Sequence, residues 1–239
     1  MSLHLDPNSS SSEQLLATSD FIDESTQICT FGDVPIAFLP PSAIIAISSL
    51  HNISEFIDKS YITHAWPANV KDIYARTVAD RAPRLFALSA LFNGSHLLHD
   101  LFMVRKLGDT SLPLDHDQRV STPWDTNGML GAFVREQRLV CAPLFTVGKF
   151  DLAAWFRSSL PFVEASRRDD MREGAEEDAY EVKFHPEHVR GLDTERTYVL
   201  REYAHEDLAA VAIRSSLFGF HCEGKYFLVA QGVAMGTGK

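Results

Sequence analysis

The sequence is poor in basic residues and lacks both paired cysteines and a long hydrophobic run. Lysine and arginine number 22 against 32 aspartates and glutamates, which gives a net charge of −10. A surface of that sign repels phosphate backbones and anionic lipids, so neither nucleic acid nor a membrane is an expected partner. The three cysteines are far apart, which excludes a disulfide framework and the paired spacing of a zinc site. We expect reduced, buried thiols.

No segment is typical of a membrane span or a secretion signal. The most apolar stretch, 34–48, is too short to cross a bilayer and is interrupted by Pro40 and Pro41. The N-terminus has no basic region followed by an apolar one, as a secretion signal would have. We therefore expect a cytoplasmic protein whose apolar stretch belongs to a core. Residues 1–14 are Ser-rich and polar and are expected to form a disordered tail.

The region 15–160 has mainly helical patterns. Periodic apolar residues predict helices over 69–82, 84–92 and 96–107, the last of which Gly108 ends. In the first of these, the spacing places Val70, Ile73, Tyr74 and Val78 near one face. A loop is predicted over 109–127, followed by a short helix to about residue 138. Beyond it, 138–145 favours a strand, and 150–164 has the mixed pattern of a helix that enters a strand.

The composition changes over 164–181, which has many charges and almost no apolar residues. We predict a solvated, charged loop there and place the boundary of a second domain, 161–239, beside it. In that domain 179–185 and 196–204 alternate apolar and polar residues, as half-buried strands do. A helix from about 206 to 219 and a strand over 225–234 follow. The expected fold class is α+β, with a mainly helical N-terminal region and then a small antiparallel sheet with one helix.

Short sequence words in this order resemble a kinase-like family common in filamentous fungi. They span about 84–217 and are RLFALSALF, SLPLD, CAPLF, SLPFVE, YEVKFHPEHV and TYVLREY. That family has a mainly helical N-terminal region before a protein-kinase fold, and the resemblance implies that the last three words are the first three strands of a kinase N-lobe. The sequence has no H-R-D-x-x-x-x-N or D-F-G motif. The expected domain over 161–239 is therefore a partial kinase-like N-lobe, truncated before the catalytic C-lobe.

Two positions correspond to the ATP site of the resembled fold, and both are degenerate. Gly174 is the remaining glycine of the phosphate-binding loop, where Glu173, Glu176 and Glu177 place carboxylates close to the expected phosphates. Arg201 stands where the family has a lysine, and its planar guanidinium is bulkier than an ammonium group. Unit charges of like sign about 4 Å apart repel by roughly 4 kcal/mol at intermediate dielectric. We therefore expect poor ATP binding.

These features predict a non-catalytic, kinase-related regulatory or interaction module with a protein partner and no cofactor. The alternative is the N-terminal part of an ATP-dependent Ser/Thr protein kinase, which would require ATP and magnesium and a C-lobe. A second alternative is a metal-dependent hydrolase with His96, His99 and Asp100 as metal ligands. A polar helix edge is the favoured explanation of that cluster.

Two other motifs also have ordinary structural explanations. His185 and His188 are close enough in sequence to share a metal, but in the resembled family this word marks a turn, and a turn or cap is the favoured interpretation. Gly236 and Lys239 follow an apolar strand, as in a phosphate-binding loop. Val233 occupies the position of the first motif glycine, so no functional phosphate loop is predicted.

Overall fold

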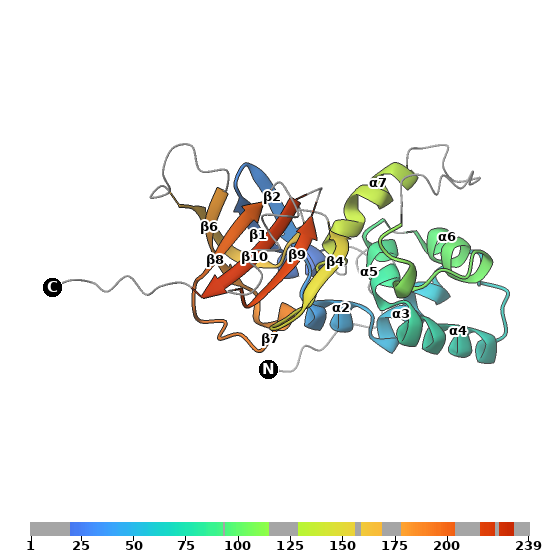
Figure 1. Cartoon of the computed structure of the whole chain (residues 1–239). Coiled ribbons are helices and arrows are strands. Elements are labelled where there is room, and N and C mark those ends of the chain that lie inside the picture. Colours follow the sequence, from blue (N-terminus) through green and yellow to red (C-terminus); the bar gives the residue numbers. More distant parts are fainter. Residues whose placement is uncertain are drawn as a thin grey trace. The chain divides into compact units, whose positions relative to one another are not determined.

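The structure, a computed structural model, describes residues 20–92, 94–114, 129–155, 159–168, 178–203, 216–222 and 225–231 (Figure 1). The chain divides into two compact units, neither of which is continuous in sequence. The helical unit comprises residues 1–26 and 41–141, and the sheet unit comprises residues 27–40 and 142–239. The fold class is α+β, as predicted.

The helical unit contains helices that pack through short apolar faces. Its described α-helices are α2 (Pro41–Ile47), α3 (Leu50–Asp58), α4 (Ala68–Arg81), α5 (Pro83–Leu91), α6 (Ser95–Leu98) and α7 (Met129–Glu136). The ring of Phe56 on α3 lies 5.3 Å from that of Phe86 on α5, edge to face. The helices predicted over 69–82 and 84–92 are confirmed as α4 and α5. Pro83 begins α5, where its missing N–H removes no intrahelical hydrogen bond.

The third predicted helix starts as α6 and continues as a π-helical segment, η1 (His99–Val104). It ends at Lys106 and not at Gly108, which corrects the prediction. Lys106 has a φ of 60°, in the left-handed region that often ends a helix, and the Leu107 amide donates to the Leu101 carbonyl. Gly108 has a different role: a Cβ there would lie 2.9 Å from the Arg81 carbonyl oxygen, so glycine allows this turn to approach the end of α4.

The sheet unit contains a six-stranded sheet, a hairpin and a short parallel pair. The strands are β1 (Gln27–Phe31), β2 (Val34–Phe38), β3 (Phe145–Thr146), β4 (Phe150–Trp155), β5 (Phe162–Arg167), β6 (Asp178–Phe184), β7 (Val189–Arg190), β8 (Tyr198–Tyr203), β9 (Phe218–Cys222) and β10 (Lys225–Gln231). The large sheet has the order β4-β9-β10-β8-β6-β5, and its neighbours are antiparallel except for β4 and β9. The predicted small antiparallel sheet is thus larger than expected, and it is mixed.

The β1–β2 hairpin packs on one face of this sheet and completes its core. Phe31, Ile36 and Phe38 are fully buried in the same cluster as Phe162 and Tyr180. Figure 1 shows the hairpin, in blue, beside the sheet. Residues 27–38 were predicted to belong to the helical region 15–160, and the sheet unit also begins at 142, before the predicted boundary. Packing on the sheet removes the apolar side chains of the hairpin from water.

Several predicted elements differ from the structure. The segment 138–145, predicted as a strand, begins in the 3-10 helix η4 (Gln137–Leu139) and is strand only at Phe145, and Gly219, predicted to end a helix, lies in β9. The segment 150–164, expected to begin as a helix, is strand β4 over 150–155, because pairing with β9 outweighs the helix propensity of its alanines. The charged loop expected over 164–181 is strand over 164–167 and 178–181, and 169–177 lie outside the described residues. Charges are compatible with these strands because they lie on the exposed positions: Glu164 and Glu181 are exposed, whereas Ala179 and Tyr180 are buried.

The structure also bears on the expectations about a membrane span and about the burial of the cysteines. No helix of the described residues is long and apolar enough to cross a membrane. All three cysteines are free; Cys141 and Cys222 are buried as expected, whereas Cys29 is only half-buried. Burial raises the pKa of the Cys141 thiol to about 12, so this side chain is an unreactive core residue.

Candidate functional site

The six-stranded sheet has two faces of different character. Cα partners on neighbouring strands share a face, and successive residues of one strand alternate between faces. Leu200 and Glu202 of β8 therefore lie on the face that packs against the hairpin core. Arg201 and Tyr203 lie on the opposite face. The predicted site position on β8 is thus on the side of the sheet away from the main core cluster.

Arg201 is the one predicted ATP-site residue that the structure describes. Its side chain is exposed, and its Cα partners are Ala179 of β6 and Leu228 of β10. Gly174 lies outside the described residues. Arg201 is therefore placed in the middle of the sheet, at the centre of a face that is partly polar.

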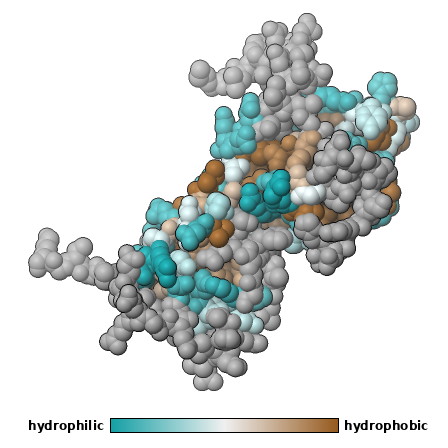
Figure 2. Space-filling view, turned by 90° about the horizontal axis from the view of Figure 1, so that it is seen from above, coloured by the Kyte–Doolittle hydropathy of each residue, from teal (hydrophilic) through white to brown (hydrophobic). Residues whose placement is uncertain are grey.

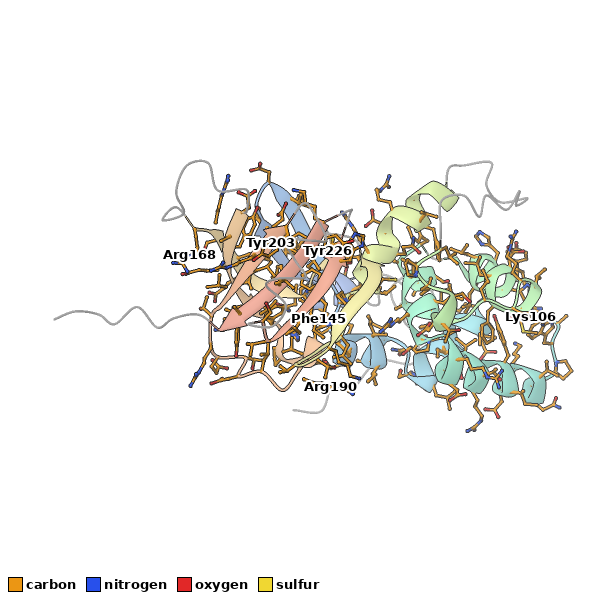
Figure 3. The ribbon with its side chains drawn as sticks, viewed as in Figure 1. Lys106, Phe145, Arg168, Arg190, Tyr203 and Tyr226 are labelled. Atoms are coloured by element: carbon orange, nitrogen blue, oxygen red, sulfur yellow. The ribbon has the colours of Figure 1, made fainter. Side chains whose placement is uncertain are left out.

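A row of aromatic side chains shares this face with Arg201. Tyr203 of β8 is the Cα partner of Tyr226 of β10, which is in turn the partner of His221 of β9. The rings of His221 and Tyr226 lie 5.0 Å apart, and Figure 3 shows Tyr203 and Tyr226 on neighbouring strands. The sequence reasoning missed this row, although the period-two alternation of β8 and β10 is sufficient to place both tyrosines on one face.

A charged cavity of about 500 Å³ lies at the end of the sheet on the core face. Its walls come from the turn between β1 and β2 and from strands β5, β6, β8 and β10. Gly32 forms that turn with a φ of 59°, and Asp33 follows it at the rim. The hairpin thus does more than cover the core: it also supplies one wall of this polar cavity.

The charges of this cavity are arranged mainly as ion pairs. Glu202 is 4% exposed, and its Oε1 accepts a hydrogen bond from Nζ of Lys225. On the other side, Arg167 of β5 donates to Asp178 of β6 at 2.5 Å. With Asp33 the lining has three carboxylates and two cations, a net negative charge. Such a cavity favours cationic groups over a triphosphate.

The sequence reasoning did not identify Glu202 and Lys225 as neighbours. A buried carboxylate loses its hydration and requires a paired cation, so a lone acid in an alternating strand is a signal that a partner exists. The strand pattern alone does not identify which lysine pairs with Glu202. The partner is fixed by the antiparallel register of β8 and β10, which only the folded sheet reveals.

Two of the proposed hydrolase ligands, His99 and Asp100, contact other side chains. Asp100 forms an ion pair with Arg105, with 2.7 Å between its Oδ2 and the arginine Nε. The ring of His99 lies 5.7 Å from the ring of Trp66. Within the parts of the chain that the structure describes, no three metal-ligating side chains gather. The geometry thus gives the hydrolase alternative no support.

His185 and His188 have structural roles at the turn η6 (Pro186–His188). Nδ1 of His185 accepts a hydrogen bond from the Glu187 amide and caps the turn. His188 is 3% exposed; its Nδ1 lies 2.9 Å from the Pro143 carbonyl oxygen, and its ring lies 5.2 Å from that of Phe38. The favoured turn-and-cap interpretation is confirmed.

This arrangement predicts a loss of stability in acid. Burial lowers the pKa of His188, so below about pH 6.5 the unfolded chain binds more protons than the folded chain. The contribution of His188 is therefore present above that pH and is lost as the pH falls. His185, whose pKa burial also lowers, contributes with the same sign. Urea unfolding at a series of pH values should show a slope of up to about 1.4 kcal/mol per pH unit for each histidine.

The variant His188→Gln isolates this contribution. Its unfolding free energy should vary less between neutral and mildly acidic pH than that of the original protein, even if it is lower at every pH. An unchanged slope would contradict the assignment. His51→Gln, at an exposed position on α3, provides a matched control for the substitution itself.

Comparisons with protein-family models, with curated proteins and with solved structures find no match to this chain.

Proposed function

We propose that the protein is a non-catalytic, kinase-related interaction module whose sheet unit is an N-lobe-like scaffold. The observation that carries this proposal is the position of Arg201. It occupies the middle of the sheet, exposed, where the resembled fold has a phosphate-binding lysine, while Lys225 on the next strand pairs with Glu202 on the other face. The module would bind a protein partner and would neither bind ATP nor transfer phosphate.

The strand order supports the kinase-related part of the proposal. Strands β5, β6 and β8, which contain the three words assigned to the first N-lobe strands, lie side by side in chain order. Strand β10 then lies between β8 and β9, so the strands that follow β8 continue the same sheet. The connection from β8 to β9 has room for the helix that follows the third strand of a kinase. Strand β4 and the β1–β2 hairpin are additions to that arrangement.

The charges support the non-catalytic part of the proposal. Phosphate binding in a kinase needs a lysine ammonium group and backbone amides that approach the phosphates without side chains between them. Here the lysine is replaced by a guanidinium group, which is larger and is aimed differently. The whole chain has a net charge of −10, which disfavours an anionic ligand such as a triphosphate.

The surface supports a protein partner. Several large apolar side chains are exposed in the described residues, among them Ile28 of β1 and Ile73 of α4, at 75% and 62%. Figure 2 shows hydrophobic side chains, in brown, that alternate with hydrophilic ones, in teal, on one face of the molecule. Mixed surfaces of this kind are typical of non-obligate protein interfaces.

Titration calorimetry with magnesium-ATP tests the proposal. We expect no saturable heat at millimolar nucleotide and no rise in melting temperature. If the protein did bind the nucleotide, a concentration of about 100 times the Kd would add about 2.7 kcal/mol of stability and raise the melting temperature. Arg201→Ala should behave like the original protein. Saturable binding that Arg201→Ala abolishes, together with phosphorylation of a generic substrate, would overturn the proposal in favour of the kinase alternative.

A further inference from the structure

A second cavity, of about 630 Å³, lies within the helical unit and has no role in the sheet-unit site. It is a groove between the last turns of α4 and the segment 102–110. Its apolar lining comes from Pro83, Phe102, Met103 and Leu107. Gly108 and Arg81 both line it, and a Cβ on Gly108 would lie 2.9 Å from the Arg81 carbonyl oxygen, so the segment packs closely against the end of α4 there.

The groove combines this apolar lining with a cationic rim. Lys106 is exposed and lies at its edge, and Figure 3 shows it at the surface of the helical unit. The carboxylate of Asp109 also lines the groove, but it accepts hydrogen bonds of 3.0–3.1 Å from the amides of Arg84 and Leu85 at the start of α5. Its charge is thus offset by the helix N-terminus. Arg81 and Asp80 are exposed and only 3.9 Å apart, so they largely cancel.

The groove continues beyond the cavity along an exposed apolar stripe of α4. Val70, Ile73 and Thr77 recur at the spacing of one helix face, and Thr77 lines the cavity. Val70 and Ile73 are 39% and 62% exposed, whereas Tyr74 and Val78, predicted near the same face, are buried. From Val70 to Thr77 the stripe extends about 10 Å along the helix axis. A small molecule that filled the cavity would leave this stripe uncovered, whereas a helix of a partner protein would cover both.

We propose that this groove binds an amphipathic, acidic helical segment of a partner protein, with the apolar side chains of the segment on Ile73 and the groove and a carboxylate on Lys106. The inference rests on the proposed function, since it names the chemistry of the partner of an interaction module. Helices that lie in apolar grooves use side chains at i, i+3, i+4 and i+7, which matches the spacing of the α4 stripe. The ion pair with Lys106 adds selectivity for an acidic segment over a basic one.

The probe is a fluorescein-labelled peptide of about twelve residues, or about 18 Å as a helix, with leucines at that spacing and two glutamates at one end. Its partner probe has glutamines in place of the glutamates. Binding to the full chain is measured by fluorescence anisotropy. We expect saturable binding of the acidic peptide, and weaker binding of the glutamine peptide at low salt.

Two variants locate the site. Ile73→Ser removes an exposed apolar contact and should weaken binding of both peptides by about tenfold or more. Lys106→Gly removes the side chain with its ammonium group and leaves the backbone unstrained, because glycine accepts the φ of 60°, and it should weaken binding of the acidic peptide by about threefold to fivefold. The glutamine peptide should bind this variant and the original protein equally.

Controls separate binding from folding. Lys106→Gly should melt at the same temperature as the original protein or higher, so its lost affinity cannot come from unfolding. Lys59→Gln removes an exposed lysine of α3 that pairs with Glu55, away from the groove lining, and should leave binding unchanged. Absence of peptide binding, or equal binding by the original protein and Ile73→Ser, would overturn the inference. Either result without ATP binding leaves the proposed function standing, whereas ATP binding would remove the proposed function itself.

Discussion

Replacement of Phe31 by alanine is expected to lower the free energy of unfolding of the sheet unit by about 3–5 kcal/mol. Phe31 is fully buried, and its ring lies 5.2 Å from Phe162, 4.4 Å from Tyr180 and 6.0 Å from Phe227. These partners come from β5, β6 and β10, so one side chain of the hairpin contacts three strands of the sheet. Alanine would leave a cavity that these fixed strands cannot close, and the lost burial and the cavity both contribute to the cost.

The same strand provides the control for this prediction. Ile28 of β1 is 75% exposed, so Ile28→Ala should change the stability by less than about 0.5 kcal/mol. Hydrogen exchange of the β8 and β10 amides reports on the sheet unit separately from the helical unit. We expect faster exchange of these amides in Phe31→Ala and no change in Ile28→Ala. Equal effects of the two substitutions would mean that the hairpin is peripheral to the sheet and not part of its core.

The hairpin illustrates why part of the fold could not be predicted from the sequence. Strands β6 and β8 were predicted because their alternation is local, and α4 and α5 because helix periodicity is local. The role of residues 27–38 depends on packing against β5, whose sequence lies far along the chain, and no local pattern identifies that partner. The same reasoning applies to β4. Its local sequence Leu-Ala-Ala favours a helix, but pairing with β9 makes the segment a strand.

The candidate site was predictable to a similar extent. Alternation along β8 is enough to place Arg201 on one face and Glu202 on the other. It cannot bring Asp33, Glu202 and Lys225 around one cavity, because they come from three strands or turns whose register is tertiary. The cap at Lys106 was missed for a different reason: the left-handed position after a helix is usually glycine, and Gly108 stood nearby as the expected residue.

Replacement of Gln137 by alanine is the other substitution with a large expected effect, of about 2–5 kcal/mol in the helical unit. Gln137 is fully buried; its Oε1 accepts a hydrogen bond from the Leu114 amide at 2.7 Å, and its Nε2 donates to the Leu114 carbonyl at 2.8 Å. The side chain thus satisfies both backbone groups of one residue, as a neighbouring strand would. Alanine would leave a buried donor and a buried acceptor without partners and would open a cavity beside them.

A glutamate at this position separates hydrogen bonding from volume. Gln137→Glu keeps the shape and the acceptor for the Leu114 amide, but its second oxygen, when ionised, faces the Leu114 carbonyl oxygen. Since only the protonated carboxyl can donate there, the folded state should raise the pKa of the new carboxyl. Its stability relative to that of the original protein should then be greater near about pH 4 than at neutral pH, and this difference should become less favourable as the pH rises, opposite in sign to the contribution of the buried histidines. Urea unfolding at both pH values measures this. Arg135→Ala on α7, whose side chain is 66% exposed, is the control that should be nearly neutral at both.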